Sequence, residues 1–570
     1  MSRSKYVTLD LGGHSTPNEK QKQTIPNFQS TNPESAHLDL TLGIEIECLL
    51  LQDTRPNLAT SSNPTNLSGR QRIHAILSQP IKVNCSSCGK PHNFSLPLNS
   101  VASSHHQQQQ IDTDYMKWTV DEDSSLALTS AELNALGDRR PYTKFDRIEV
   151  KSRVLNANQP LLTTESIADS FHTHSVKWED EISAIYERLI ETFNAVPGVP
   201  GFRLVVNPSS GLHVHIGNGH KGFPLKTIKN VLSMCVANEQ AIDSLHSVDR
   251  VTGSTLAFSE QRTSWLVENY TDECLDDTIY NVPWSAHFQL LAFKLSLGET
   301  SSADGTASDH GYMRNEYPAN ALWMWPSLEQ TAQQNDVPSW LKLIRCAKDV
   351  KSLRNLQGAM AHNSTVNLSN ILDFSADGTN RGMFGDKKMT VEFRQHRATL
   401  RPTEVIAWIN VLLNLFTFCH DQSMSEVKDL CEQTWSDPSH DALAFLKNIG
   451  VDARTYNHYE TFLDLGDNYL SKYARDVHES ELQAIAQFGS DDFFLPLCKF
   501  IVEEQTASMS LREIYTRIRE KLVTGGYGQF EAEYVQQLSV TPAERRKLTI
   551  GWILDRPGDL KSPTEPSCFG

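Results

Sequence analysis

The sequence lacks the features that mark membrane, secreted and nucleic-acid-binding proteins. No apolar run is expected to reach the roughly 20 residues of a membrane span. Residues 1–32 are polar, without the apolar segment of a secretory signal. The net charge is −17, which argues against nucleic acid or an anionic membrane as the main partner. These absences predict a cytoplasmic protein.

Cysteines are few and scattered, so a disulfide framework is not expected. Several of the 10 cysteines lie in apolar segments, as small buried hydrophobes do. A single C-x-x-C, Cys85-Ser86-Ser87-Cys88, with His92 nearby, would supply half of the ligands of a zinc site. A second C-x-x-C is missing, and His105 and His106 lie in a Gln-rich stretch typical of disorder. The sequence therefore favours a labile loop pair over zinc.

Several catalytic signatures are also missing from the stretches described below. These stretches hold no phosphate-binding G-x-x-x-x-G-K-[ST], no G-x-S-x-G and no H-E-x-x-H. P-loop enzymes, α/β-hydrolases and zincin proteases are therefore not expected.

The length of 570 residues allows two or more domains, or one large domain with extensions. We expect a disordered tail at 1–37, a folded domain at 38–420 and a mostly helical extension at 421–570. A polar, partly disordered insertion is expected within the folded domain at about 52–113, and irregular structure at 250–335.

Hydrophobic periodicity predicts the elements of the folded domain. Strands are expected at 38–51, 118–126, 147–155, 202–207, 212–216, 365–368 and 389–396. Helices are expected at 175–194, 223–246, 339–356 and 403–419. Strands and helices do not alternate steadily, which favours an α+β fold: a mainly antiparallel sheet with helices covering one face.

Three predicted strands place ionisable residues two positions apart. They supply Glu45 and Glu47, then His213 and His215, then Glu392, Arg394 and His396. Side chains at this spacing share one face of a strand, so each strand buries its apolar residues on the other face.

This pattern suits divalent cations and phosphate. Two carboxylates about 7 Å apart on one strand repel each other unless a cation or an arginine lies between them. Histidine binds metals or donates to phosphate, and arginine neutralises phosphate. The alternatives are a solvated strand face and a surface ion pair, but glutamate is uncommon in strands. Glu149 and Asp123 lie in two weaker stretches that also fit ordinary strand ends.

The stretches occur in an order that resembles the amidoligase family, a branch of the carboxylate–amine ligase superfamily with glutamine synthetase and glutamate–cysteine ligase. The resemblance is carried by Gly43–Glu47, Trp118 with Asp123–Leu126, Glu149–Ser152, Ser210–Gly217 and Val391–His396. It covers about 38–420. The sequence departs from the family pattern at Lys151-Ser152-Arg153 and at Asp123-Ser124, where the family tends to have Asp-Gly.

The resemblance implies a glutamine synthetase/glutamate–cysteine ligase-like fold, with the active site on the face of the sheet opposite the helices. ATP and Mg²⁺, with Mn²⁺ as an alternative, are the implied cofactors. The implied metal ligands are Glu45, Glu47, Glu149, His213 and Glu392. The implied cofactor-binding set is His215, Arg394 and His396, with Arg394, His215 and Glu392 catalytic.

The implied activity is ATP-dependent joining of a carboxylate to an amine, as an amide or isopeptide bond, through an acyl phosphate. The substrates would be small-molecule or peptide carboxylates and amines, and a homo-oligomer is compatible with the family. Arg314, Asn315 and Trp323–Trp325 are candidates for the substrate pocket. Two alternatives remain: a metal-dependent hydrolase or phosphoryl-transfer enzyme using the same site, and a non-catalytic scaffold of the same fold.

Overall fold

The structure is a computed structural model, and it describes seventeen parts of the chain. These are residues 38–55, 67–85, 88–100, 114–158, 161–167, 170–194, 201–219, 222–247, 250, 284, 288, 337–357, 364–371, 389–437, 440–463, 472–487 and 492–510. The expected tail at 1–37, almost all of 250–335 and the stretch 511–570 lie outside these parts. The candidate pocket residues Arg314, Asn315 and Trp323–Trp325 are therefore outside the described residues.

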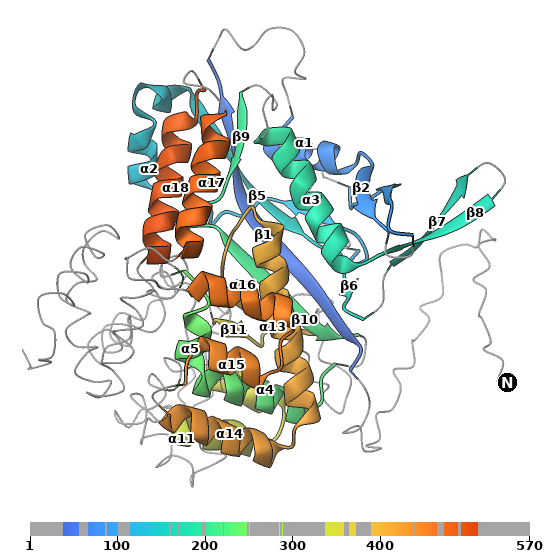
Figure 1. Ribbon diagram of the computed structural model, residues 1–570, viewed down its shortest axis with the longest axis vertical. Helices are drawn as coiled ribbons and strands as arrows, with labels where there is room; N and C mark the ends of the chain where they lie inside the picture. Colours follow the sequence, from blue (N-terminus) through green and yellow to red (C-terminus); the bar gives the residue numbers. More distant parts are fainter. Residues whose placement is uncertain are drawn as a thin grey trace, which may run out of the picture.

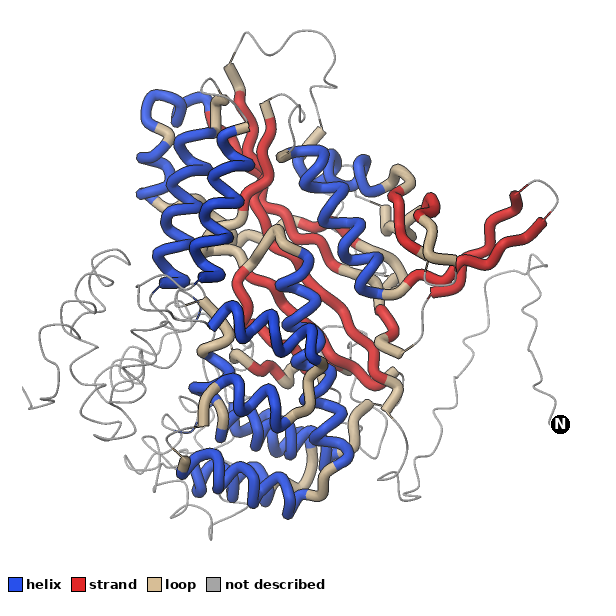
Figure 2. The backbone as a smooth tube through the Cα atoms, in the orientation of Figure 1, coloured by secondary structure: helices blue, strands red, loops and turns tan. Residues whose placement is uncertain are grey.

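A mainly antiparallel sheet forms the centre of an α+β fold, which confirms the predicted class (Figures 1 and 2). Its strand order is β11 (Val366–Asn367), β12 (Thr390–Arg397), β10 (Gly211–Asn218), β1 (Leu40–Asp53), β5 (Thr143–Lys151) and β4 (Thr119–Asp121). The short strands β6 (Leu155–Asn156) and β9 (Phe202–Val205) also pair with β1. With 14 residues, β1 is long enough to pair with four strands.

One face of the sheet carries the main hydrophobic core. Leu42, Ile44 and Ile46 alternate along β1 and are buried there. Helices α3 (Trp178–Phe193) and α13 (Pro402–Asp421) contribute to the same cluster. Aromatic contacts join Phe393 of β12 to Trp408 and Phe416 of α13. This surface is called the core face below.

Helix α13 is long and apolar enough, by length and composition alone, to cross a membrane, and 61% of its most apolar 18-residue stretch is buried within the structure. The expectation that no apolar run reaches that length is therefore wrong for 402–421. A core helix of this length meets the same criteria, because burial on most sides requires apolar residues around most of the helix. Its contacts with α3, β10, α4 (Leu225–Ala237) and α16 (Ala453–Leu463) account for this composition.

The opposite face is also covered by helices at one end, so the expectation of helices on a single face is incomplete. Leu49 and Leu51 of β1 enter a second hydrophobic cluster with residues of α2 (Ser130–Ala135), α17 (Lys472–Ala486) and α18 (Leu495–Ser510). In Figure 1, α17 and α18 stand beside the end of β1 that pairs with β9. The other end of this face is polar.

Much of the expected insertion is folded. It contains α1 (Gly69–Leu77) and the hairpin of β2 (Ile81–Asn84) with β3 (Pro91–Phe94). Ile73, Leu77, Ile81 and Val83 are buried in the main core. These four buried residues therefore attach the otherwise polar insertion to the folded domain. Residues 56–66, 86–87 and 101–113 of the insertion lie outside the described parts.

Several predicted elements are shorter or divided. The strand expected at 118–126 is only β4, followed by a turn. The helix at 223–246 is α4 (Leu225–Ala237) and α5 (Glu239–Asp243), and the helix at 339–356 is α11 (Val337–Cys346) and α12 (Val350–Gln357). The remaining elements are η3 (Gly137–Tyr142), the hairpin β7 (Leu161–Ile167) and β8 (Ser170–Val176), α14 (Met424–Ser436), α15 (Ala442–Asn448) and α16 (Ala453–Leu463).

Candidate metal-binding site on the central sheet

The ionisable residues of the three stretches meet because their strands are neighbours in the sheet. Glu45 of β1 pairs with His213 of β10, and Glu47 pairs with Glu149 of β5. On the far side of β10, His215 pairs with Glu392 of β12. Paired residues lie on the same face of a sheet. The set formed by Glu45, Glu47, Glu149, His213, His215, Glu392 and Arg394 is called the acidic face below.

The first acidic group consists of Glu45, His215 and Glu392. One ligand atom from each lies within 4.8 Å of the others. His215 Nε2 is buried 3.1 Å from Glu45 Oε1 but makes no hydrogen bond. Its other ring nitrogen is 3.1 Å from the Thr390 hydroxyl, which orients the ring. A buried imidazole nitrogen without a hydrogen bond, beside two carboxylates, is the arrangement that a metal ligand requires.

Glu392 is fixed by its neighbours on both oxygens. Asn367 Nδ2 donates to Oε2 at 2.8 Å, and Arg394 Nη1 donates to Oε1 at 2.7 Å. Asn370 adds a longer bond of 3.3 Å to Oε2. Burial alone raises the pKa of Glu392, but Arg394 and His215 outweigh it and lower the pKa to about 2. This carboxylate is therefore ionised throughout the physiological range.

The second acidic group consists of Glu47, Asp123 and Glu149, again with ligand atoms within 4.8 Å of one another. The backbone N–H of Gly211 donates to Glu47 Oε2 at 2.5 Å, and Lys151 Nζ lies 2.8 Å from Glu149 Oε2. The turn after β4 presents Asp123, whose Oδ1 accepts a bond from the Ser125 N–H at 2.8 Å.

In their ionised forms these carboxylates would carry more negative charge than the surrounding protein compensates, so they tend to hold protons instead. Burial, followed by repulsion from Asp123, raises the pKa of Glu47 to about 8. Burial, followed by repulsion from Glu45, raises the pKa of Glu149 to about 8. Buried carboxylates near one another remain ionised at neutral pH only when a cation lies between them. The second group is suited to such a cation.

His213 lies between the two groups. Its Nδ1 is 3.3 Å from Glu45 Oε2, and its Nε2 is 3.4 Å from Glu47 Oε1. Burial and the charge of Arg394 lower the pKa of His213 to about 4. The resemblance implied that His213 binds metal and His215 contacts phosphate. In the structure His215 belongs to a group with metal-ligand geometry, whereas His213 bridges the carboxylates of both groups.

Basic side chains border the acidic face. Arg394 is buried, and the pKa of its guanidinium is raised because attraction by Glu392 and Glu47 outweighs burial. Arg250, which sequence reasoning missed, donates from Nη2 to the Arg394 carbonyl at 3.3 Å. A Cβ on Gly211 would lie 2.4 Å from Arg250 Nη2, so a glycine is needed for the arginine to approach.

His396 is not brought to the acidic face, contrary to its predicted place beside Arg394. The pairing of β10 with β12 shifts between Leu212 and Val214, so that Leu212 faces His396 while Val214 faces Phe393. This bulge turns every residue after it to the other side. The His396 ring accordingly contacts Trp408 and His246 on the core face, and burial lowers its pKa to about 4.

One departure from the family pattern, at Lys151-Ser152-Arg153, has a structural explanation. The Ser152 hydroxyl accepts a bond from the Ile44 N–H at 2.8 Å, and the Ser152 N–H donates to the Ile44 carbonyl at 2.8 Å, which closes the end of β5 on β1. Arg153 is paired with the fully buried Glu181 of α3 at 2.7 Å. The Trp118 indole also donates a hydrogen bond to Glu181 at 2.8 Å, so Trp118 and Arg153 have a structural role.

Three residues of the site were missed or left open by sequence reasoning. Asp123 was noted only as a strand end, although its side chain completes the second acidic group. Asn367 lies in a predicted strand, and its pairing with Glu392 would have followed from the strand order. No local signal marks Arg250, because the long connection from β10 to β12 brings it to the site.

The arrangement offers oxygen ligands for hard divalent cations and arginines for an anion beside them. Comparison with known proteins adds nothing to this chemistry, because no family model, no curated protein and no solved structure matches the chain.

Proposed function

We propose that this protein is an ATP- and metal-dependent carboxylate–amine ligase. The observation that carries the proposal is the acidic face itself, where two groups of metal-ligand residues and a buried arginine share one side of the central sheet. Their order along the chain is also the order of the amidoligase-like stretches. The substrates are a small-molecule or peptide carboxylate and an amine.

The residues fit Mg²⁺ or Mn²⁺. Glu47, Asp123 and Glu149 supply carboxylate oxygens alone, which both ions favour, whereas the imidazole of His215 beside Glu45 and Glu392 is a donor that Mn²⁺ accepts more readily. Bound at these groups, divalent ions supply charge neutralisation for the phosphates of ATP.

The chain's own residues supply positioning and fixed charge. Arg394 is held by Glu392, so its guanidinium is oriented before any substrate arrives. Such a fixed cation stabilises the oxygens of a phosphoryl group as it is transferred to the substrate carboxylate. Attack of the amine on the resulting acyl phosphate then forms the amide and releases phosphate.

ADP release is the measurement that tests the proposal. Wild-type protein is supplied with MgATP and pools of carboxylates and amines, and ADP and amide are followed together. Glu392→Gln should lower the rate by about 100-fold or more, the cost of removing one preorganised charge. The matched control is Glu432→Gln, which removes the same charge from an exposed ion pair on α14 and should leave the rate unchanged.

Thermal melting tests nucleotide binding without knowledge of the substrates. A ligand at 100 times its Kd adds about 2.7 kcal/mol to the stability of the fold, so MgATP should raise the melting temperature of wild type and of Glu432→Gln but not of Glu392→Gln. ADP release that needs neither acid nor amine would instead indicate a metal-dependent hydrolase on the same residues. Unchanged turnover in folded Glu392→Gln would contradict both.

A further inference from the structure

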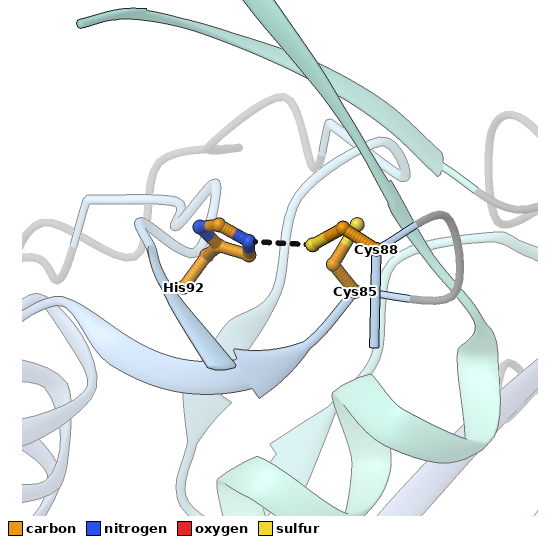
Figure 3. Close-up of side chains that lie close together, drawn as sticks. All are labelled: Cys85, Cys88 and His92. Carbon is orange, nitrogen blue, oxygen red and sulfur yellow. Dashed lines mark hydrogen bonds between the residues drawn. The ribbon is translucent and has the colours of Figure 1, made fainter. Parts of the chain in front are cut away.

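A third group of metal-ligand side chains lies away from the acidic face, at the end of the β2–β3 hairpin. It consists of Cys85, Cys88 and His92, whose ligand atoms all lie within 4.8 Å of one another. Figure 3 shows the two thiols and the imidazole gathered together, with Cys88 Sγ 3.0 Å from His92 Nε2. Both cysteines are free thiols.

The backbone of the hairpin holds the two cysteines in this position. The Cys85 N–H donates to the Lys90 carbonyl at 3.0 Å, and the Gly89 N–H donates to the Cys85 carbonyl at 2.7 Å. Gly89 has a φ of +68°, which glycine adopts without strain. These two bonds hold Cys88 near Cys85, and the pairing of His92 with Val83 places the imidazole on the adjoining strand.

One backbone contact of Cys85 suits a metal-bound thiolate. Cys85 is buried, and its sulfur accepts a bond from the Ser175 N–H at 3.4 Å. Backbone N–H groups that point at a sulfur stabilise its thiolate form and orient it toward a metal. Ser175 belongs to β8, so this contact also joins two hairpins that are separate in sequence.

We propose that Cys85, Cys88 and His92 bind a zinc ion. Two thiolates and an imidazole are ligands that zinc prefers, and in a tetrahedral site the ligand atoms stand about 3.5–3.8 Å apart. Small side-chain movements would bring the three ligand atoms here to these distances. The fourth position is taken by water or by a further side chain. Binding releases the thiol protons, because only the thiolate ligates zinc.

The ion would stabilise the end of a short element. Strands β2 and β3 have four residues each, and an isolated hairpin of this size is marginally stable. Ile81 and Val83 anchor one side of it in the main core beside α3. Zinc at the turn fixes the opposite end, and it serves the fold rather than the acidic face.

Metal analysis of the full-length protein, purified without chelators, tests the site. We expect one zinc per chain in wild type and in Cys346→Ser, which removes an exposed cysteine of α11 as a matched control. Cys88→Ser and His92→Ala should lose the ion. After exchange with Co²⁺, wild type should show a thiolate-to-cobalt charge-transfer band that persists in Glu47→Gln, because the acidic groups contain carboxylates and imidazole but no thiol.

A measurement on wild type alone covers the case in which the variants fail to fold. Zinc should slow alkylation of Cys85 and Cys88 at least tenfold, and a chelator should restore the rate without changing that of Cys346. The proposal is overturned if wild type carries no more zinc than Cys88→Ser, if zinc leaves the alkylation rates unchanged, or if an intact mass lower by two hydrogens reveals a Cys85–Cys88 disulfide.

Discussion

Glu47 and Glu149 pair with each other on adjacent strands, and both have a pKa raised to about 8. Burial is the first cause in each, and nearby carboxylates add to it. Each group therefore holds a proton in the folded protein at pH values where the unfolded chain, with an ordinary value near 4.5, has lost it. Because the folded and unfolded states bind different numbers of protons, the free energy of unfolding depends on pH.

The metal-free protein should lose stability as the pH rises from about 5 to about 8. The contribution of a group with a raised folded pKa is fully present below its unfolded value and disappears as the pH passes the folded value. Each glutamate adds up to about 1.4 kcal/mol per pH unit to this slope. Urea unfolding at several pH values measures it, and Glu47→Gln should flatten it. Equal slopes in the two proteins would contradict the assignment.

A divalent cation should reverse this dependence, because it binds the ionised carboxylates and competes with protons. Mn²⁺ should therefore raise the melting temperature more at pH 8 than at pH 6. Glu47→Gln should show a smaller rise at pH 8, while the exposed Glu432→Gln should behave as wild type. A rise independent of pH would place the ion elsewhere.

Strand alternation explains why most of the acidic face was predictable from sequence. Glu45, Glu47, His213 and His215 lie on regular strands, where side chains two apart must share a face. His396 shows where the same rule fails. A bulge adds one residue to β12 opposite β10, and no residue type in Val391–His396 marks it. Regular alternation therefore predicts the wrong face for His396.

Loop residues could not be placed in the same way. Asp123 and Arg250 reach the site through a turn and a long connection, and local spacing carries no information about contacts made at such distances in sequence. By contrast, Leu49 and Leu51 follow Glu45 and Glu47 on one face of β1. The sequence therefore contained the change from polar to apolar along that face.

Helix α3 is joined to the sheet region by a buried ion pair as well as by apolar contacts. Glu181, fully buried, is bound to Arg153 on two oxygens and also accepts from the Trp118 indole. Removing one charge from such a pair leaves the other buried without compensation, which is costly.

We therefore expect Arg153→Met to lower the free energy of unfolding by about 3–5 kcal/mol. Glu181→Gln keeps an acceptor for Trp118, so the double variant Arg153→Met/Glu181→Gln should be more stable than Arg153→Met alone. Urea unfolding of wild type, both single variants and the double variant gives the coupling energy. Additive losses would show that the two side chains do not stabilise each other.

At the scale of the whole molecule, the C-terminal helices belong to the same structure as the sheet. Phe493, Phe494 and Leu497 pack in the second hydrophobic cluster. Arg203 of β9 forms an ion pair with Asp492, and Arg139 donates to the Asp492 and Phe493 carbonyls at 3.1 and 2.9 Å. These contacts cover one end of the sheet face opposite the core face. That end is apolar, and the other end of the same face carries the acidic groups.

Removing the chain after Leu463 should therefore expose Leu49 and Leu51 of β1, because α17 and α18 are lost with it. We expect the truncated protein to bind a hydrophobic dye and to melt at a lower temperature than the full chain.

Leu497→Ala makes a smaller change in the intact protein. Leu497 is fully buried, so shortening its side chain should lower the free energy of unfolding by about 2–5 kcal/mol. The exposed Trp435→Ala of α14 is the control and should cost far less. Two results would contradict these expectations. If the truncated protein melts at the wild-type temperature and binds no dye, residues 464–570 are independent of the sheet. Leu497→Ala would then leave the unfolding of residues 38–463 unchanged.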